Sequence, residues 1–116
     1  LDQTLVKSAQ HKKFPIIPGV ATASEVMQAM SLGLHVCKLF PAEAINGLAL
    51  LKAFASPFHA MHFCPTGGIS DTNAEAYLKL PNVIAVGSSW PVDNALLEQG
   101  DWPTVRQRAL ALVEQY

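Results

Sequence analysis

Charged residues are scarce in this chain. Lysine and arginine contribute 8 residues and aspartate and glutamate 9, so only 15% of the 116 residues are charged and the net charge is −1. Without a surplus of basic residues, there is no electrostatic basis for binding nucleic acid or an anionic membrane surface. Long apolar runs are missing too: none approaches the roughly 18 residues of a membrane-spanning helix, and no segment resembles a signal peptide. We therefore expect a cytoplasmic globular protein.

Metal-binding and disulfide patterns are also missing from the sequence. The two cysteines, Cys37 and Cys64, lie in separate apolar runs and form no CxxC pair, which favours free thiols. The four histidines share no metal-ligand spacing with acidic or thiolate residues. We expect no metal and no other cofactor.

Strand-like and helix-like segments alternate along the chain, and half of all residues are hydrophobic. After a helix over residues 3–11, we expect four strands at 14–17, 34–40, 60–64 and 82–86. The helices that follow them are expected at 22–33, 47–55 and 71–80, with further helical segments to the end of the chain. This nearly even spacing of strand and helix is typical of a parallel sheet with helices outside it.

Four strand–helix units make about half of a (β/α)₈ TIM barrel, which needs eight units and at least about 200 residues. Half a barrel exposes two strand edges and one apolar face of the sheet. We therefore expect an α/β fold in which residues 1–116 form the C-terminal half of a single TIM-barrel domain. The N-terminal half of the same barrel is expected to belong to the same protein.

Lys38 is the only charged residue in the apolar run from Leu34 to Pro41. Burial opposes the charge of an ammonium group, and a lysine that loses its proton becomes an amine that can add to a carbonyl carbon. The alternative is a lysine near the end of a strand whose amino group reaches solvent. The run thus makes Lys38 a candidate nucleophile.

The last two expected strands each end in a loop that contains glycine and hydroxyl side chains. The residues are Thr66, Gly67 and Gly68 in the first loop, and Gly87, Ser88 and Ser89 in the second. Glycine lets backbone N–H groups approach an anion closely, and a helix that follows adds a favourable dipole. In parallel barrels, phosphate often binds at the loops after the last two strands. Both loops are therefore candidate phosphate-binding segments.

Four motifs together resemble the C-terminal half of the 2-keto-3-deoxy-6-phosphogluconate (KDPG) aldolase and 4-hydroxy-2-oxoglutarate aldolase family. They are IPGVAT at 17–22, VCKLFPAE at 36–43, FCPTGGI at 63–69 and GSSW at 87–90. The resemblance covers nearly the whole chain. It implies a class I aldolase that cleaves KDPG to pyruvate and glyceraldehyde 3-phosphate through a Schiff base.

By this resemblance, Lys38 matches the lysine that forms the Schiff base. The loop of Thr66, Gly67 and Gly68 matches one that contacts the substrate and its phosphate, and Ser89 matches a phosphate-binding serine. The family more usually has Gly-Gly-Ser-Trp where this chain has GSSW at 87–90, so Ser88 replaces a residue without a side chain.

The family likeness also implies a homotrimeric enzyme of the Entner–Doudoroff pathway of carbohydrate metabolism. In the family, the general acid/base glutamate and the arginine and threonine that hold the pyruvate carboxylate lie in the first half of the barrel. Two alternatives stay open. One is a sister aldolase for 4-hydroxy-2-oxoglutarate or 2-keto-3-deoxy-6-phosphogalactonate, and the other is a phosphate-binding half-barrel without catalysis.

Two residues close to Lys38 in the sequence have competing interpretations. Phe40 lies two positions along the strand, on the same face by alternation, so it either walls the site or simply fills the barrel. Glu43 is the only carboxylate near Lys38 in the sequence. We expect Glu43 to cap or pair with a neighbouring element rather than to transfer protons.

Overall fold

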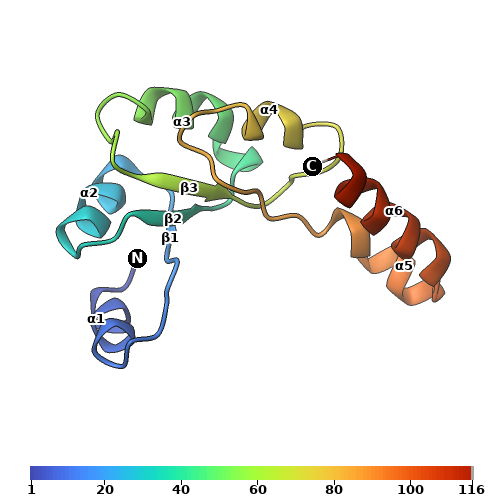
Figure 1. The fold of residues 1–116 in the computed structure, drawn as a ribbon, viewed down its shortest axis with the longest axis horizontal. Coiled ribbons are helices and arrows are strands. Elements are labelled where there is room, and N and C mark those ends of the chain that lie inside the picture. The colour runs from blue at the N-terminus through green and yellow to red at the C-terminus, as the bar shows by residue number, and fades with distance from the viewer. Residues whose placement is uncertain (116) are drawn as a thin grey trace.

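The computed structural model describes residues 1–115 as a small parallel sheet with helices around it (Figure 1). The first part contains α1 (Gln3–His11), β1 (Gly19–Val20), α2 (Ala23–Ser31), β2 (Val36–Leu39), the short 3₁₀ helix η1 (Glu43–Ile45) and α3 (Gly47–Phe54). The second part contains β3 (His62–Pro65), α4 (Ala74–Leu78), the 3₁₀ helix η2 (Trp90–Val92), α5 (Asn94–Gln99) and α6 (Trp102–Gln115). The alternation of strand and helix follows the sequence prediction as far as α4.

The strands are all parallel and lie in the order β1-β2-β3. Lys38 in the central strand is level with Gly19 on one side and Cys64 on the other. The expected fourth strand over 82–86 is reduced to two isolated parallel bridges beside β3, Phe63 to Val83 and Thr66 to Gly87. The parallel α/β prediction is confirmed, and the fourth strand position is occupied without forming a continuous strand.

The first strand lies later than the sequence predicted, at Gly19–Val20 instead of residues 14–17. Proline has no backbone N–H to donate to a ladder; Pro15 interrupts the predicted segment and Pro18 directly follows it. Pairing begins at the carbonyl of Pro18, which accepts a hydrogen bond from the Lys38 N–H at 2.8 Å. Ile17, which was expected inside the strand, is 56% exposed.

Side chains at the helix ends account for where the helices begin. Thr22 and Glu25 form a reciprocal capping box at the start of α2. The predicted helix over 71–80 begins only at Ala74, because the Asn73 side chain accepts a hydrogen bond from the Ser70 N–H at 2.9 Å and closes a turn before it.

The core lies on one face of the sheet, which α3 and α4 cover (Figure 1). Alternate strand residues point into this core and are completely buried, namely Cys37, Leu39 and Phe63. The residues between them, Lys38 and Cys64, are only half-buried and point to the opposite face. Over residues 1–115 no helix is long and apolar enough to span a membrane.

Candidate active site

Three loops meet at the carboxyl ends of the strands. Because the strands are parallel, the loop after β2, the loop after β3 and the segment after residue 86 leave the sheet at the same edge. The Ala42 N–H donates to the Thr66 carbonyl at 2.8 Å, and the Glu43 N–H donates to the Gly67 carbonyl at 3.1 Å. Thr66 is in turn bridged to Gly87. The three segments therefore form one connected rim.

Lys38 lies just below this rim, on the face of β2 that points away from the helices. Its amino group is 4.9 Å from the centroid of the Phe40 ring, so both side chains occupy the face that strand alternation predicted. The ring shields one side of the amine from water and attracts its positive charge. Within residues 1–115 no carboxylate forms an ion pair with Lys38.

The loop of Thr66, Gly67 and Gly68 is packed too closely to accept side chains at either glycine. Both glycines have positive φ, +100° at Gly67 and +77° at Gly68, which disfavours other residues. A Cβ atom at Gly67 would lie 3.2 Å from the Phe40 ring, and one at Gly68 would lie 2.7 Å from the Cβ and Cγ atoms of Glu43. The glycines thus bring this loop against the segment that follows Lys38.

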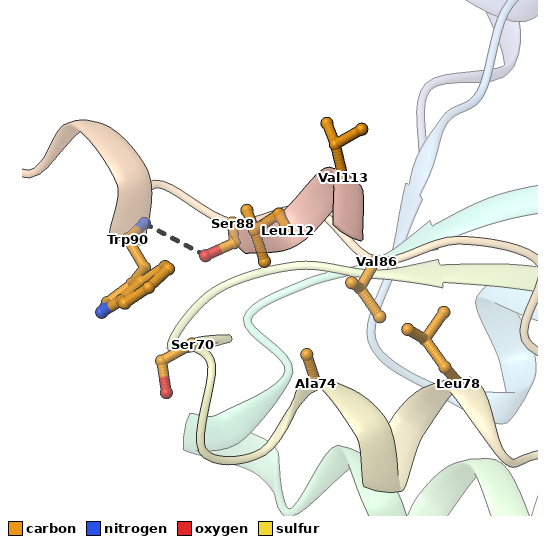
Figure 2. Close-up of a pocket in the computed structure, with 8 residues that line it drawn as sticks. All are labelled: Ser70, Ala74, Leu78, Val86, Ser88, Trp90, Leu112 and Val113. Atoms are coloured by element: carbon orange, nitrogen blue, oxygen red, sulfur yellow. Dashed lines mark hydrogen bonds between the residues drawn. The ribbon is translucent and has the colours of Figure 1, made fainter. Parts of the chain in front are cut away.

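The second glycine loop is locked to the first. A Cβ atom at Gly87 would lie 2.5 Å from the Thr66 hydroxyl oxygen. The Ser88 hydroxyl donates to the Ile69 carbonyl and accepts from the Trp90 N–H at 3.0 Å (Figure 2). Ser89 is exposed and directly precedes η2. Both serines are thus exposed, and the Ser88 hydroxyl is hydrogen-bonded within the rim.

Glu43 pairs with a side chain that the sequence analysis did not single out. Its carboxylate accepts a hydrogen bond from the hydroxyl of Tyr77, a residue of α4 that is 1% exposed. Burial raises the pKa of Tyr77, and the adjacent Glu43 raises it further. The expectation that Glu43 pairs with a neighbouring element is confirmed. The pair is 34 residues apart in the sequence, and no local pattern indicates it.

Arg108 on α6 secures the far side of the rim. Its guanidinium donates to the Trp90 carbonyl at 2.6 Å and to the Asp93 carboxylate at 2.7 Å, and it lies 4.9 Å from the Trp90 ring. The N–H of Leu96 and this arginine lower the pKa of Asp93. Trp90 thus packs against Arg108, a residue that the sequence analysis did not single out.

A mostly apolar hollow of about 360 Å³ lies on the helical side of the rim, with residues of α4 and of α6 on its two sides (Figure 2). Its lining residues are Ser70, Ala74, Leu78, Val86, Ser88, Trp90, Leu112 and Val113. Lys38 is not among them, and a phosphate needs more polar partners than this lining offers. The hollow therefore shares Ser88 with the candidate active site but does not include Lys38.

The two cysteines are free thiols in different surroundings, Cys37 in the core and Cys64 beside Lys38 on the open face. Burial raises the pKa of Cys37 to about 11. In the part of the chain that the structure describes, no group of three or more histidine, cysteine, aspartate or glutamate side chains is placed to hold a metal ion.

The chain is similar in sequence to known proteins. A family model described as "Aldolase: KDPG and KHG aldolase" matches residues 1–108. The chain is 44% identical over 112 residues to a 2-dehydro-3-deoxy-phosphogluconate aldolase of Pseudomonas aeruginosa, which covers 97% of this chain and 51% of that protein. It is 45% identical over 114 residues to a KHG/KDPG aldolase of Escherichia coli, covering 98% of this chain and 54% of the relative. The chain spans about half the length of the curated relatives it matches.

Solved structures extend the match to three dimensions. A KDPG aldolase from Legionella pneumophila, with pyruvate captured as a covalent carbinolamine intermediate, superposes with a TM-score of 0.90 at 40% identity over 96% of this chain and 54% of that one. A 2-keto-3-deoxy-6-phosphogluconate aldolase of Zymomonas mobilis with 3-phosphoglycerate gives a TM-score of 0.78 at 48% identity, covering 81% of this chain and 45% of the other. As its motifs predicted, the chain belongs to the KDPG and KHG aldolase family.

Proposed function

We propose that residues 1–116 are the C-terminal half of a (β/α)₈ barrel and carry the Schiff-base lysine of a class I aldolase. The proposed reaction cleaves 2-keto-3-deoxy-6-phosphogluconate to pyruvate and glyceraldehyde 3-phosphate. The observation that carries the proposal is the position of Lys38, on the open face of the sheet directly beneath a rim of two glycine loops. The covalent pyruvate adduct of the Legionella relative supports this chemistry.

In this mechanism the neutral amine of Lys38 attacks the keto carbon of the substrate and gives a carbinolamine. Loss of water leaves a positively charged iminium, which acts as an electron sink. The keto carbon, now the iminium carbon, is C2 of the substrate. Removal of the proton from the hydroxyl on C4 breaks the bond between C3 and C4, and the electron pair of that bond forms the enamine between C2 and C3. Glyceraldehyde 3-phosphate leaves as the aldehyde. Protonation of the enamine and hydrolysis then release pyruvate and the free lysine.

The residues around Lys38 have separate parts in this proposal. Phe40 walls the site and limits access of water to the amine. The loop of Thr66, Gly67 and Gly68 contacts the substrate and its phosphate, and the segment of Gly87, Ser88 and Ser89 completes the phosphate site. Within that segment the Ser89 hydroxyl faces the phosphate. Ser88 keeps the segment in place, because its own hydroxyl is already bonded to Ile69 and Trp90.

Proton transfer and recognition of the pyruvate carboxylate are assigned to the other half of the barrel. We assign Glu43 no proton transfer, because its carboxylate accepts a hydrogen bond from the hydroxyl of Tyr77 on α4. The complete enzyme is proposed to be a cytoplasmic homotrimer. A second activity, cleavage of 4-hydroxy-2-oxoglutarate, is favoured by the Escherichia coli relative, which bears both substrates in its name.

The test uses a complemented barrel, in which residues 1–116 are joined to the part of the Escherichia coli relative that lies outside the match. Pyruvate is added, the imine is reduced with borohydride, and the modified peptide is identified by mass spectrometry. We expect label on Lys38 and none after Lys38→Arg. The other lysines of this chain lie on helices or polar turns, for example Lys52 on α3, so label on one of them would overturn the assignment. The absence of label would favour a half-barrel that binds phosphate without catalysis.

A further inference from the structure

The side chain of Glu43 is wedged against the loop that follows β3. Its Cβ and Cγ atoms occupy the space where a side chain at Gly68 would begin, only 2.7 Å from that position. Its own N–H donates to the Gly67 carbonyl at 3.1 Å. The backbone and the aliphatic stem of one residue therefore hold two consecutive glycines, a residue type whose backbone has unusual conformational freedom.

The end of the same side chain is anchored to α4. The Tyr77 hydroxyl donates to the Glu43 carboxylate, and the tyrosine ring is buried in the core. A charge-assisted hydrogen bond of this kind is about twice as strong as one between neutral groups. Glu43 is exposed, but the loop holds its backbone and Tyr77 holds its carboxylate, so both ends of its stem are restrained beside Gly68.

Lys38 does not depend on this anchor. It is held by its own strand, through the hydrogen bond from its N–H to the Pro18 carbonyl at 2.8 Å and its register with Cys64. Loss of the anchor should therefore loosen the loop of Thr66, Gly67 and Gly68 without moving the nucleophile. A substitution can therefore alter the glycine loop while Lys38 keeps its position.

We propose that Glu43, held by Tyr77, is a positioning residue that determines preference for phosphorylated over unphosphorylated 2-keto acids. The inference rests on the proposed function, in which the glycine loop contacts phosphate. A substrate with a phosphate group uses the loop, whereas 4-hydroxy-2-oxoglutarate has a carboxylate and no phosphate at the corresponding end. Disruption of the hydrogen bond between Glu43 and Tyr77 thus lowers the preference for phosphorylated 2-keto acids, while Lys38 still forms the Schiff base.

The experiment compares Tyr77→Phe, Glu43→Ala and Glu43→Gln in the complemented barrel. Tyr77→Phe keeps the buried ring and removes only the hydroxyl, and Glu43→Gln keeps the stem and a hydrogen-bond acceptor. We expect Tyr77→Phe and Glu43→Ala to raise the KM for KDPG about tenfold, the size of one lost hydrogen bond to a charged group. The KM and kcat for 4-hydroxy-2-oxoglutarate should change less than about twofold, and Glu43→Gln should recover most of the KDPG affinity.

The matched control is Glu75→Gln. Glu75 also lies on α4, but its exposed carboxylate pairs with Lys79. This control should leave both substrates unaffected. Equal losses for the two substrates in Tyr77→Phe would overturn the proposal, as would a Glu43→Ala variant with unchanged KM for KDPG.

Hydrogen exchange separates this inference from the proposed function. The N–H groups of Ala42 and Glu43 donate to the glycine loop, so their exchange should be about tenfold faster in Tyr77→Phe and unchanged in Glu75→Gln. If the wild type fails to label at Lys38 but these amides respond, the proposed function fails and the anchor stands. If Lys38 is labelled but exchange at Ala42 and Glu43 is unchanged in Tyr77→Phe, the positioning role of Glu43 is rejected and the proposed function stands.

Discussion

Replacing Gly68 with alanine tests how tightly the rim is packed. Gly68 has φ +77°, and the added methyl would lie 2.7 Å from two carbon atoms of Glu43, well inside the 3.5–4.0 Å at which carbon atoms pack. The left-handed conformation costs alanine about 1–2 kcal/mol. Overpacking adds about 1–3 kcal/mol, because the Glu43 stem is held at both ends. The expected total loss of stability is about 2–5 kcal/mol.

A second glycine in the same conformation supplies the control. Gly33 has φ +75° and nothing within 4 Å of the position of an added methyl. Gly33→Ala should therefore show only the backbone cost, about 1–2 kcal/mol. Urea unfolding of both variants of the complemented barrel, followed by circular dichroism, gives the two values on one scale. Equal losses in Gly68→Ala and Gly33→Ala would refute the close contact with Glu43.

Three further predictions concern the phosphate site, the thiols and assembly. Ser89→Ala should raise the KM for KDPG and spare the exchange of pyruvate methyl protons, measured by NMR, because that exchange needs only the lysine end; equal damage to both would argue for a role in folding or at the catalytic centre. Iodoacetamide at pH 8 should alkylate Cys64 and leave Cys37 intact, since the thiolate is the reactive form and burial raises the pKa of Cys37 to about 11. The rate at Cys37 should rise only as the pH approaches that value, and rapid labelling of Cys37 at pH 8 would contradict its burial. Residues 1–116 expressed alone should aggregate, be molten or dimerise through the open sheet edges and lack aldolase activity, whereas the complemented barrel should sediment as a trimer; an active monomer of the short chain would show that half a barrel suffices.

The position of Lys38 and of both glycine loops relative to the strands could be predicted because it depends on local signals. An apolar run marks a strand, a glycine marks its end, and parallel strands bring their ends to one edge. The structure places Lys38, Phe40 and the two loops together at that edge. Their chemical roles stay predictions.

Other features depend on contacts between residues far apart in the sequence. The shift of β1 to Gly19–Val20 follows from which carbonyl meets the Lys38 N–H, and the hydrophobicity of residues 14–17 does not reveal it. The hydrogen bond between Glu43 and Tyr77 joins η1 to α4, 34 residues further along the chain, and no periodicity of the sequence indicates this contact. The Ser88 hydroxyl was expected at the phosphate, and only the path of the chain brings it to the Ile69 carbonyl.

Along β2 and β3, alternate residues serve different purposes: one set is buried in the core, and the other faces the open side of the sheet. Cys37, Leu39 and Phe63 are completely buried against the helices, so a change there alters the folding equilibrium. Lys38 and Cys64, one position away, face the open side, where a change alters which molecules react. Variation of substrate preference can therefore accumulate at every second strand position while the positions between them keep the protein folded. A directed-evolution library limited to the open-face positions should retain a high proportion of folded members.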